Sequence, residues 1–456
     1  ESLNADKGYD RMIREMLAGD ELAPEDPSVL RATGFLARNF HPKNRDIWLD
    51  ATVEHTAKAF LGLTINCARC HDHKYDPIKQ TAYYQFRAIF EPHGFRMDTV
   101  PTTRNIKLDG IPRVFDEKLA AETFLYASGD EKHPVKDKPM SPGLPAVLGG
   151  RFEIQTVALP ISVTRPGLRK TETTAKLSAL RSKVNAAKRA LKAAGQTNAI
   201  ALVKERRELG QQVAELELQS FEARLAADRA KYLEDVDRPT ETRQEELAQE
   251  AADLERRWLI PARQLAVALQ ESALSKAKAL KQSSKKKAAV TKAEKALADA
   301  RKSLKDANNR IAAAQGKQAE LLEYTPIGAV YPPTSTGRRL ALAKWITSRN
   351  NPLTARVAVN QIWMRHFGSP LVDNVFDFGL RSPRPLHAEM LDWLAVELME
   401  NDWSMKHVHR LILTSRTWRL ASSSGSSGVS NNSRLDLDNR YYWRMTPRRL
   451  EAEIVR

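Results

Sequence analysis

The stretch from about residue 171 to residue 323 constrains the fold more than any other part of the chain, because its composition shifts to Ala, Lys, Glu, Leu and Arg. Apolar side chains advance along it by alternating steps of three and four, the seam of a coiled coil, at Leu177, Leu180, Val184, Ala187 and Leu191. A second set repeats every seven residues, at Leu297, Leu304 and Ile311. We expect Gly195, the Arg238-Pro239 pair and Pro261 to end or kink helices. The pattern predicts a long antiparallel coiled-coil arm.

The rest of the chain divides into three predicted parts around this arm. Residues 1–100 show short helical patterns, residues 101–170 hold many Pro and Gly with short alternating runs such as 152–157, and residues 334–456 are helical again. Apolar spacing predicts helices at 10–17, 54–63, 83–90, 338–348, 354–367, 387–401 and 404–414. The expected fold is mainly α, with a helical N-terminal domain, a connector of loops and short strands, the coiled-coil insertion at 171–323, and a helical C-terminal domain that is truncated at its end.

The charge of the chain suggests a class of partner that its distribution argues against. The net charge is +16, and part of the excess lies on lysines between 281 and 287, a run without aromatic residues. Nucleic-acid binding needs a basic patch together with stacking aromatics or a reading motif, so we expect no nucleic-acid partner. No run approaches the roughly 18 apolar residues of a membrane helix, so we expect no membrane span in this chain.

The two cysteines of the chain carry its clearest chemical signal. Cys67 and Cys70 lie three residues apart, and His71 follows directly. C-x-x-C-H is the attachment signature of c-type haem, because two thiols at this spacing can each form a thioether to a haem vinyl group while the adjacent imidazole binds the iron. Aromatic residues that could form a dry wall beside the haem follow at Tyr75, Tyr83, Tyr84 and Phe86.

Other interpretations of this motif remain open. Cys67, Cys70, His71 and His73 supply two thiolates and two imidazoles, the ligand count of a tetrahedral zinc site. The four lie within seven residues, whereas structural zinc sites usually join two distant ligand pairs. A redox dithiol would favour a thioredoxin-like strand and helix around the cysteines, and the sequence pattern does not show one.

Two longer segments resemble known families. FLGLTINCARCHDHKYDPIKQTAYYQFRAIF, residues 60–90, resembles the core of the planctomycete cytochrome-c-like domain. RLALAKWITSRNNPLTARVAVNQIWMRHFG, LVDNVFDFG and VHRLILTS, between residues 339 and 415, resemble the planctomycete-specific partner domain of unknown function. Two positions depart from the usual pattern of the partner domain, Gln361 and the run 384–387.

The resemblance implies a bacterial protein, periplasmic or otherwise extracytoplasmic, with covalent haem c held by Cys67, Cys70 and His71. It implies electron transfer or a haem-dependent oxidative step linked to the use of complex, often sulfated, polysaccharides. Expected partners are a redox protein or an upstream cytochrome domain, a polysaccharide substrate, and a protein that docks on the coiled coil. The chain starts inside its first domain, so we expect a fragment whose export signal lies upstream.

The second axial ligand of such a haem is not fixed by the motif. Met97, His93 and His55 are candidates in the N-terminal domain, and an open position would instead permit binding of a small molecule. His407 and His409 are two residues apart on a predicted helix, so they cannot face one ion. Two alternative functions stay open: a structural or interaction protein with a metal-bound C-x-x-C-H-x-H site, and a glycan hydrolase that uses carboxylates such as Asp373 and Asp377. No catalytic residue is assigned.

Overall fold

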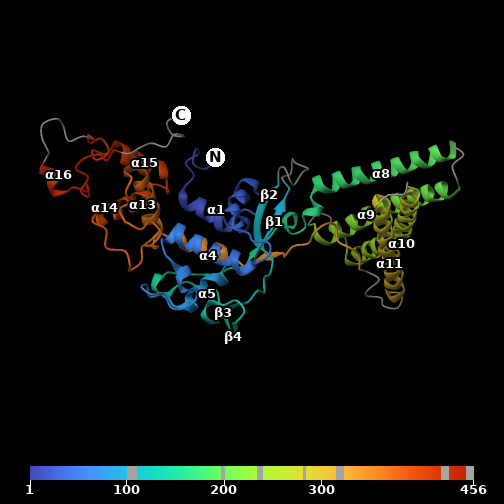
Figure 1. Cartoon of the computed structure of the whole chain (residues 1–456), viewed down its shortest axis with the longest axis horizontal. Helices are drawn as coiled ribbons and strands as arrows, with labels where there is room; N and C mark the ends of the chain where they lie inside the picture. The colour runs from blue at the N-terminus through green and yellow to red at the C-terminus, as the bar shows by residue number, and fades with distance from the viewer. Residues whose placement is uncertain are drawn as a thin grey trace. The chain divides into compact units, whose positions relative to one another are not determined.

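The computed structural model describes residues 1–99, 110–196, 201–233, 240–280, 284–314, 323–422 and 431–447. It divides into two compact units, unit 1 with Glu1–Leu159 and Pro332–Arg456, and unit 2 with Pro160–Tyr331. The fold is mainly α, which confirms the predicted class (Figure 1). The predicted N-terminal domain, most of the connector and the C-terminal domain share unit 1, while the end of the connector and the predicted arm lie inside unit 2.

The core of unit 1 is built around helix α4, Arg45–Leu61. Asn44 caps its start by accepting the backbone N–H of Ile47, and Gly62 ends it in the left-handed conformation that favours glycine. Helices α1, Tyr9–Leu22, and α5, Gln80–Ala88, pack on the same core. Helix α12, Arg338–Ile346, adds Leu342, Ala343 and Ile346 to it, so chain ends far apart in sequence share one hydrophobic core.

Three antiparallel two-stranded sheets complete this part of unit 1. Strand β1, His93–Asp98, pairs with β2, Ile111–Asp116, and β3, Thr123–Tyr126, pairs with β4, Pro134–Met140. Strand β5, Val157–Ala158, pairs with β6, Thr334–Ser335. The predicted strand at 152–157 is therefore wrong except at Val157, because the alternating run before it makes no ladder.

A second hydrophobic cluster of unit 1 holds the C-terminal helices together. They are α13, Thr354–Phe367, α14, Ala388–Glu400, and α15, Met405–Thr414. All three agree with the predicted ranges to within one residue. The shorter helices of the chain are α2, Pro27–Leu30, η1, Arg31–Thr33, α3, Gly34–Ala37, η2, Ile65–Arg69, η3, Ala127–Gly129, η4, Ala146–Leu148, α7, Ile161–Thr164, η5, Pro166–Leu168, and α16, Asn431–Leu435.

Unit 2 consists of long helices in which each packs against the next: α8, Lys170–Gln196, α9, Ala201–Tyr232, α10, Glu241–Lys278, and α11, Ser284–Ala314 (Figure 1). Ion pairs between α8 and α9 run in opposite directions along the two helices, which makes the pair antiparallel, at Lys188–Glu215, Lys183–Glu217 and Arg181–Glu222.

The residues that were expected to end or kink helices in the arm agree only in part with the structure. Helix α8 ends one residue after Gly195, as expected, and the Arg238-Pro239 pair lies outside the described residues. Helix α10 continues through Pro261, so the prediction that this proline ends a helix is wrong. Proline removes a single backbone hydrogen bond, and α10 packs against both α9 and α11.

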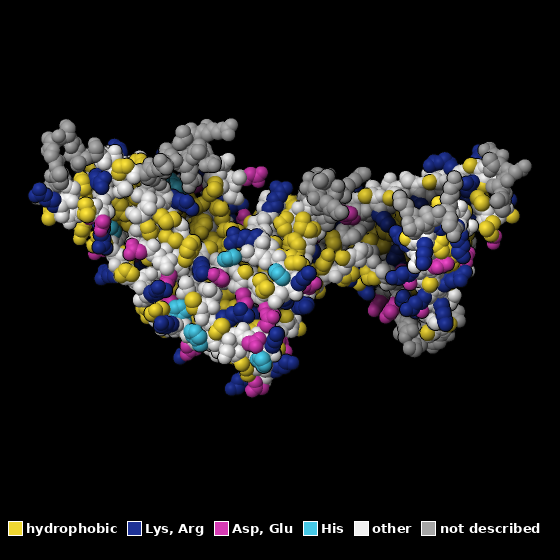
Figure 2. All heavy atoms as spheres, in the orientation of Figure 1, with side chains coloured by type: hydrophobic (Ala, Val, Ile, Leu, Met, Phe, Trp, Pro, Cys, Tyr) yellow, Lys and Arg dark blue, Asp and Glu magenta, His cyan; other side chains and the backbone are white. Residues whose placement is uncertain are grey.

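Positive and negative side chains are mixed over the drawn surface of the molecule. On the face drawn in Figure 2, Lys and Arg side chains are interspersed with Asp and Glu in both units. Among the described helices, none is both long and apolar enough to cross a bilayer.

Candidate functional site

The C-x-x-C-H motif begins in the 3-10 helix η2, which follows α4 after three residues, and Cys70 and His71 lie just past the end of η2. The backbone N–H of Cys67 donates to the carbonyl of Thr64 at 2.9 Å, which starts the turn. Cys67 and Cys70 are free thiols, and both are exposed. Both cysteines are therefore open to solvent, as the attachment of a cofactor would require.

His71 presents one of its ring nitrogens to solvent. Its Nδ1 lies 2.7 Å from the carbonyl oxygen of Asp72, so Nδ1 carries the proton and donates it. Nε2 then bears the lone pair that a metal requires, and the carbonyl orients the ring, as second-shell partners of metal-binding histidines do. The donor set of two accessible thiols and one oriented imidazole fits a covalently attached haem.

His73 has a different role, because it is nearly buried. Its Nδ1 accepts the backbone N–H of Asp76 at 2.8 Å, and its Nε2 lies 3.0 Å from the hydroxyl of Thr64. Both ring nitrogens are therefore used in closing the loop that follows the motif. The described residues contain no group of three or more His, Cys, Asp or Glu side chains placed to hold a metal ion, which gives the zinc interpretation no support.

Arg69 fixes the motif through contacts of both its backbone carbonyl and its guanidinium. Its carbonyl oxygen accepts the hydroxyl of Tyr84 at 3.2 Å and the amide of Gln80 at 2.9 Å. Its guanidinium pairs with Asp50 at 3.0 Å. Burial raises the pKa of Tyr84 to about 12, so this phenol stays a hydrogen-bond donor at every physiological pH.

Most of the aromatic residues that were expected to line a haem lie in the interior of unit 1. Tyr83, Tyr84 and Phe86 are fully buried in the core of unit 1, and Tyr126 meets Tyr84 edge-on with ring centroids 5.4 Å apart. Of the four aromatic residues predicted to line a cofactor, only Tyr75 is exposed, at 47%.

A glycine turn lies against Cys70, and the sequence analysis missed it. Gly129, in the turn between β3 and β4, has a φ of +76°, and any side chain there would collide with Sγ of Cys70. Positive φ favours glycine. A lone glycine in a loop-rich segment carries no signal that would link it to a motif 59 residues earlier in the chain.

The C-terminal segment reaches the motif loop as well. The carboxylate of Asp76, which is 7% exposed, accepts the backbone N–H of Leu380 at 2.7 Å. Phe378 donates its N–H to the carbonyl of Gly62 at 2.6 Å. A side chain at Gly379 would collide with the Asp76 carboxylate. The site is therefore built from two segments that lie about 300 residues apart in sequence, which no pattern within either segment predicts.

Gly62→Ala is expected to lower the free energy of unfolding of unit 1 by about 2–4 kcal/mol. The new methyl group would sit at a φ of +59° and come within 2.6 Å of Phe378 Cδ2. Urea unfolding followed by tryptophan fluorescence measures the loss.

Gly368→Ala is the matched control for this change. Gly368 also ends a helix at positive φ, and an added Cβ there meets nothing within 4 Å. We expect only the backbone strain of roughly 1–2 kcal/mol. Equal losses in the two variants would mean that the contact between Gly62 and Phe378 contributes nothing.

The candidate sixth ligands have other partners. His93 is fully buried and donates to the carbonyl of Phe90, and its ring lies tilted against Trp48 with centroids 4.1 Å apart. Burial lowers its pKa to about 3. His55 bonds with Asn39 at 2.8 Å, and Met97 is 40% exposed on β1. Among the described residues, no hydrogen bond or ring contact joins His93, His55 or Met97 to residues 67–73.

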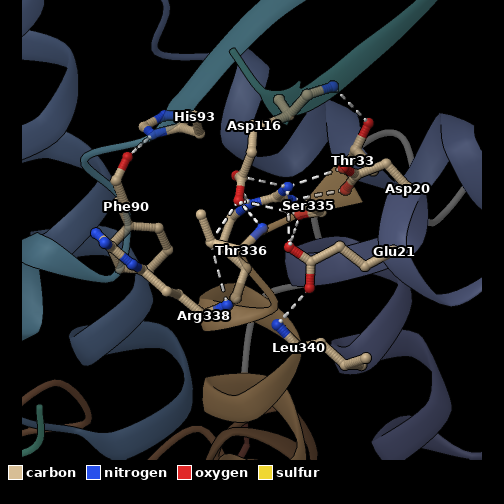
Figure 3. Close-up of polar contacts among 12 residues, drawn as sticks. Asp20, Glu21, Thr33, Phe90, His93, Asp116, Ser335, Thr336, Arg338 and Leu340 are labelled. Atoms are coloured by element: carbon tan, nitrogen blue, oxygen red, sulfur yellow. Dashed lines mark hydrogen bonds and ion pairs between the residues drawn. The ribbon is translucent and has the colours of Figure 1, made fainter. Parts of the chain in front are cut away.

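A buried ionic cluster ties the same segments together deeper in unit 1. Asp20 and Glu21 from α1 and Asp116 from β2 converge on one position, where Arg339 of α12 is 0% exposed (Figure 3). Arg339 binds Asp20 through two bonds of 2.6 and 2.8 Å. Removing charges from solvent is costly, so each buried group in this cluster depends on the partners that remain around it.

The polar residues of the C-terminal helices pair among themselves. His409 lies 2.7 Å from His366, whereas His407 lies 3.0 Å from Glu397, so the two histidines contact different partners. Asp373 lines a cavity of about 200 Å³, while Asp377 is buried and accepts the N–H of Gly379.

Comparisons with known proteins match the two ends of the chain. Residues 1–94 match the family model PSCyt2, and residues 338–456 match the family model PSD1, each described as a protein of unknown function, DUF1549 and DUF1553 respectively. No curated protein and no solved structure matches the chain. Each match covers less than half of the chain, so the two ends are similar to these families. The PSD1 match supports, in this coarser form, the partner domain predicted for residues 334–456.

Proposed function

We propose that this chain is an extracytoplasmic c-type haem protein in which Cys67 and Cys70 form the thioether bonds and His71 is the proximal ligand. The observation that carries the proposal is the state of these three side chains. Both thiols are free and exposed, and the only proton of the neutral His71 ring is engaged by Asp72, which leaves Nε2 available.

The surrounding residues support this role by holding the motif rigid. Arg69, between the two cysteines, is fixed at its carbonyl and at its guanidinium. His73 closes the following loop from within. When bound, haem supplies one-electron and small-molecule chemistry at its iron, and the protein contributes attachment, orientation and shielding.

The physiological part of the proposal concerns electrons and polysaccharides. The chain would pass electrons to a redox protein or an upstream cytochrome domain, or support an oxidative step in polysaccharide use, as the resemblance of residues 60–90 implies. A haem iron whose sixth position stayed free would suit the second possibility, because it could bind a small molecule.

The test is expression in the periplasm of a host with a haem-attachment system, followed by intact mass and visible spectroscopy. We expect the denatured chain to be heavier by one haem and to show a c-type haemochrome. The double variant Cys67→Ala, Cys70→Ala should lose all covalent haem, because it removes the two cysteines of the chain.

His71→Ala separates ligation from attachment. It should keep the added mass but change the visible spectrum, because the thioethers remain while the proximal imidazole is lost. A wild-type chain that folds, carries no added mass and has two freely alkylated thiols would contradict the proposal.

A further inference from the structure

Two exposed apolar side chains lie beside the motif loop, one from each family segment. Tyr75 is 47% exposed, and Leu380 is 75% exposed. They sit on adjoining loops, because the N–H of Leu380 binds the carboxylate of Asp76 at 2.7 Å and the guanidinium of Arg381 lies 5.6 Å from the Tyr75 ring centroid. The hydrogen bond of its backbone N–H therefore fixes Leu380 where its side chain is exposed to solvent.

A chain of short contacts connects this pair to the thiols. The N–H of Cys67 binds Thr64, the hydroxyl of Thr64 binds His73, and His73 accepts the N–H of Asp76. Asp76 in turn accepts the N–H of Leu380. These hydrogen bonds join the loop that holds Tyr75 and the backbone of Leu380 to the turn that carries Cys67.

The charges around Tyr75 are also unbalanced. Lys74 Nζ lies 5.4 Å and the Arg381 guanidinium 5.6 Å from the Tyr75 ring centroid. Neither cation forms an ion pair with a carboxylate in the described part of the chain, whereas Lys79 nearby pairs with Asp72 at 2.8 Å. Two apolar surfaces with two unpaired cations complement a flat apolar group that carries two carboxylates, and haem with its propionates is such a group.

We propose that Leu380 and Tyr75 form an apolar bed for the attached haem, and that Arg381 and Lys74 face its propionates. This inference rests on the proposed function. It assigns to the PSD1-matching segment a direct part in the cofactor environment, since Leu380 and Arg381 belong to residues 338–456. Haem binding would then bury a leucine that the bare chain leaves in water.

The test compares Leu380→Glu with the wild type, both loaded with haem. A carboxylate beside the iron stabilises the ferric form, which carries one more positive charge than the ferrous form. We expect the equilibrium constant for reduction to fall about tenfold, which is about 59 mV for a one-electron couple. Potentiometry gives the shift, and intact mass shows that attachment is unchanged.

Leu437→Glu is the matched control, because Leu437 is 77% exposed and belongs to the same family segment. This variant should change the equilibrium constant for reduction by less than twofold. Leu380→Met should also leave the reduction potential unchanged. Circular dichroism checks that both Leu380 variants are folded. If haem attaches and Leu380→Glu shifts the potential no more than Leu437→Glu, the bed is overturned while the proposed function stands. A wild-type chain without haem overturns both.

Discussion

Arg339→Ala is expected to lower the free energy of unfolding of unit 1 by about 3–5 kcal/mol, because it leaves buried carboxylates without their cation. Arg339 is 0% exposed and binds Asp20 bidentately, with Asp116 at 3.1 Å and Glu21 at 3.2 Å. Urea unfolding followed by tryptophan fluorescence reports mainly on unit 1, because Trp258 is the one tryptophan of unit 2.

Arg349→Ala provides the comparison for this loss. Arg349 lies 3.8 Å from Glu400, and its side chain is 66% exposed, so this pair is worth at most about 1 kcal/mol. Arg339→Lys should recover part of the stability, because an ammonium restores the charge but not the bidentate geometry. Similar losses from Arg339→Ala and Arg349→Ala would show that the cluster does not hold unit 1 together.

The position of Arg339 explains why the two family segments fold as one unit. Its partners lie in α1 and β2, and it begins α12. Leu342 and Ile346 of α12 then enter the same core as Leu17 of α1. The long insertion of unit 2 separates these elements in sequence, so the contacts between them fix a topology that the composition of either segment leaves open.

The parts of the fold that follow from local pattern were predictable. Helix α13 spans Thr354–Phe367, the predicted range, because its apolar spacing is regular and Gly368 ends it. The helices of unit 2 follow from the repeat of apolar residues. The exposure of Cys67, Cys70 and His71 also agrees with a motif that must be reached by a cofactor.

Long-range polar contacts were not predictable. Arg339 stands in the run RRLALAKW, where an arginine normally faces water, and only its partners 319 residues away in sequence make its burial possible. The bond between Asp76 and Leu380 crosses 304 residues in the same way. The resemblance covered both segments, so it offered a signal that they act together, but it gave no geometry. Pairings of this kind depend on tertiary placement, which apolar periodicity does not encode.

The charge balance of the cluster sets a pH dependence. One guanidinium faces the carboxylates of Asp20, Glu21 and Asp116, so full ionisation would leave the cluster negative. Burial, together with the carboxylates of Asp116 and Asp20, raises the pKa of Glu21 to about 8 against the attraction of Arg339. The folded chain then binds a proton at Glu21 that the unfolded chain, with the ordinary pKa of 4.5, releases.

Glu21→Gln is therefore expected to flatten the pH dependence of stability. The contribution of protonated Glu21 is complete below pH 4.5 and is lost as the pH rises through about 8, a change on the order of 4 kcal/mol for a shift of this size. Glutamine stays neutral and can still accept the N–H of Leu340, which Glu21 accepts at 2.9 Å. Urea unfolding of both proteins at pH 5.5 and pH 8.5 measures the difference: the variant should gain on the wild type as the pH rises. Because every other titrating group is common to the two proteins, parallel pH profiles would mean that Glu21 is ionised throughout and that Arg339 alone balances the cluster.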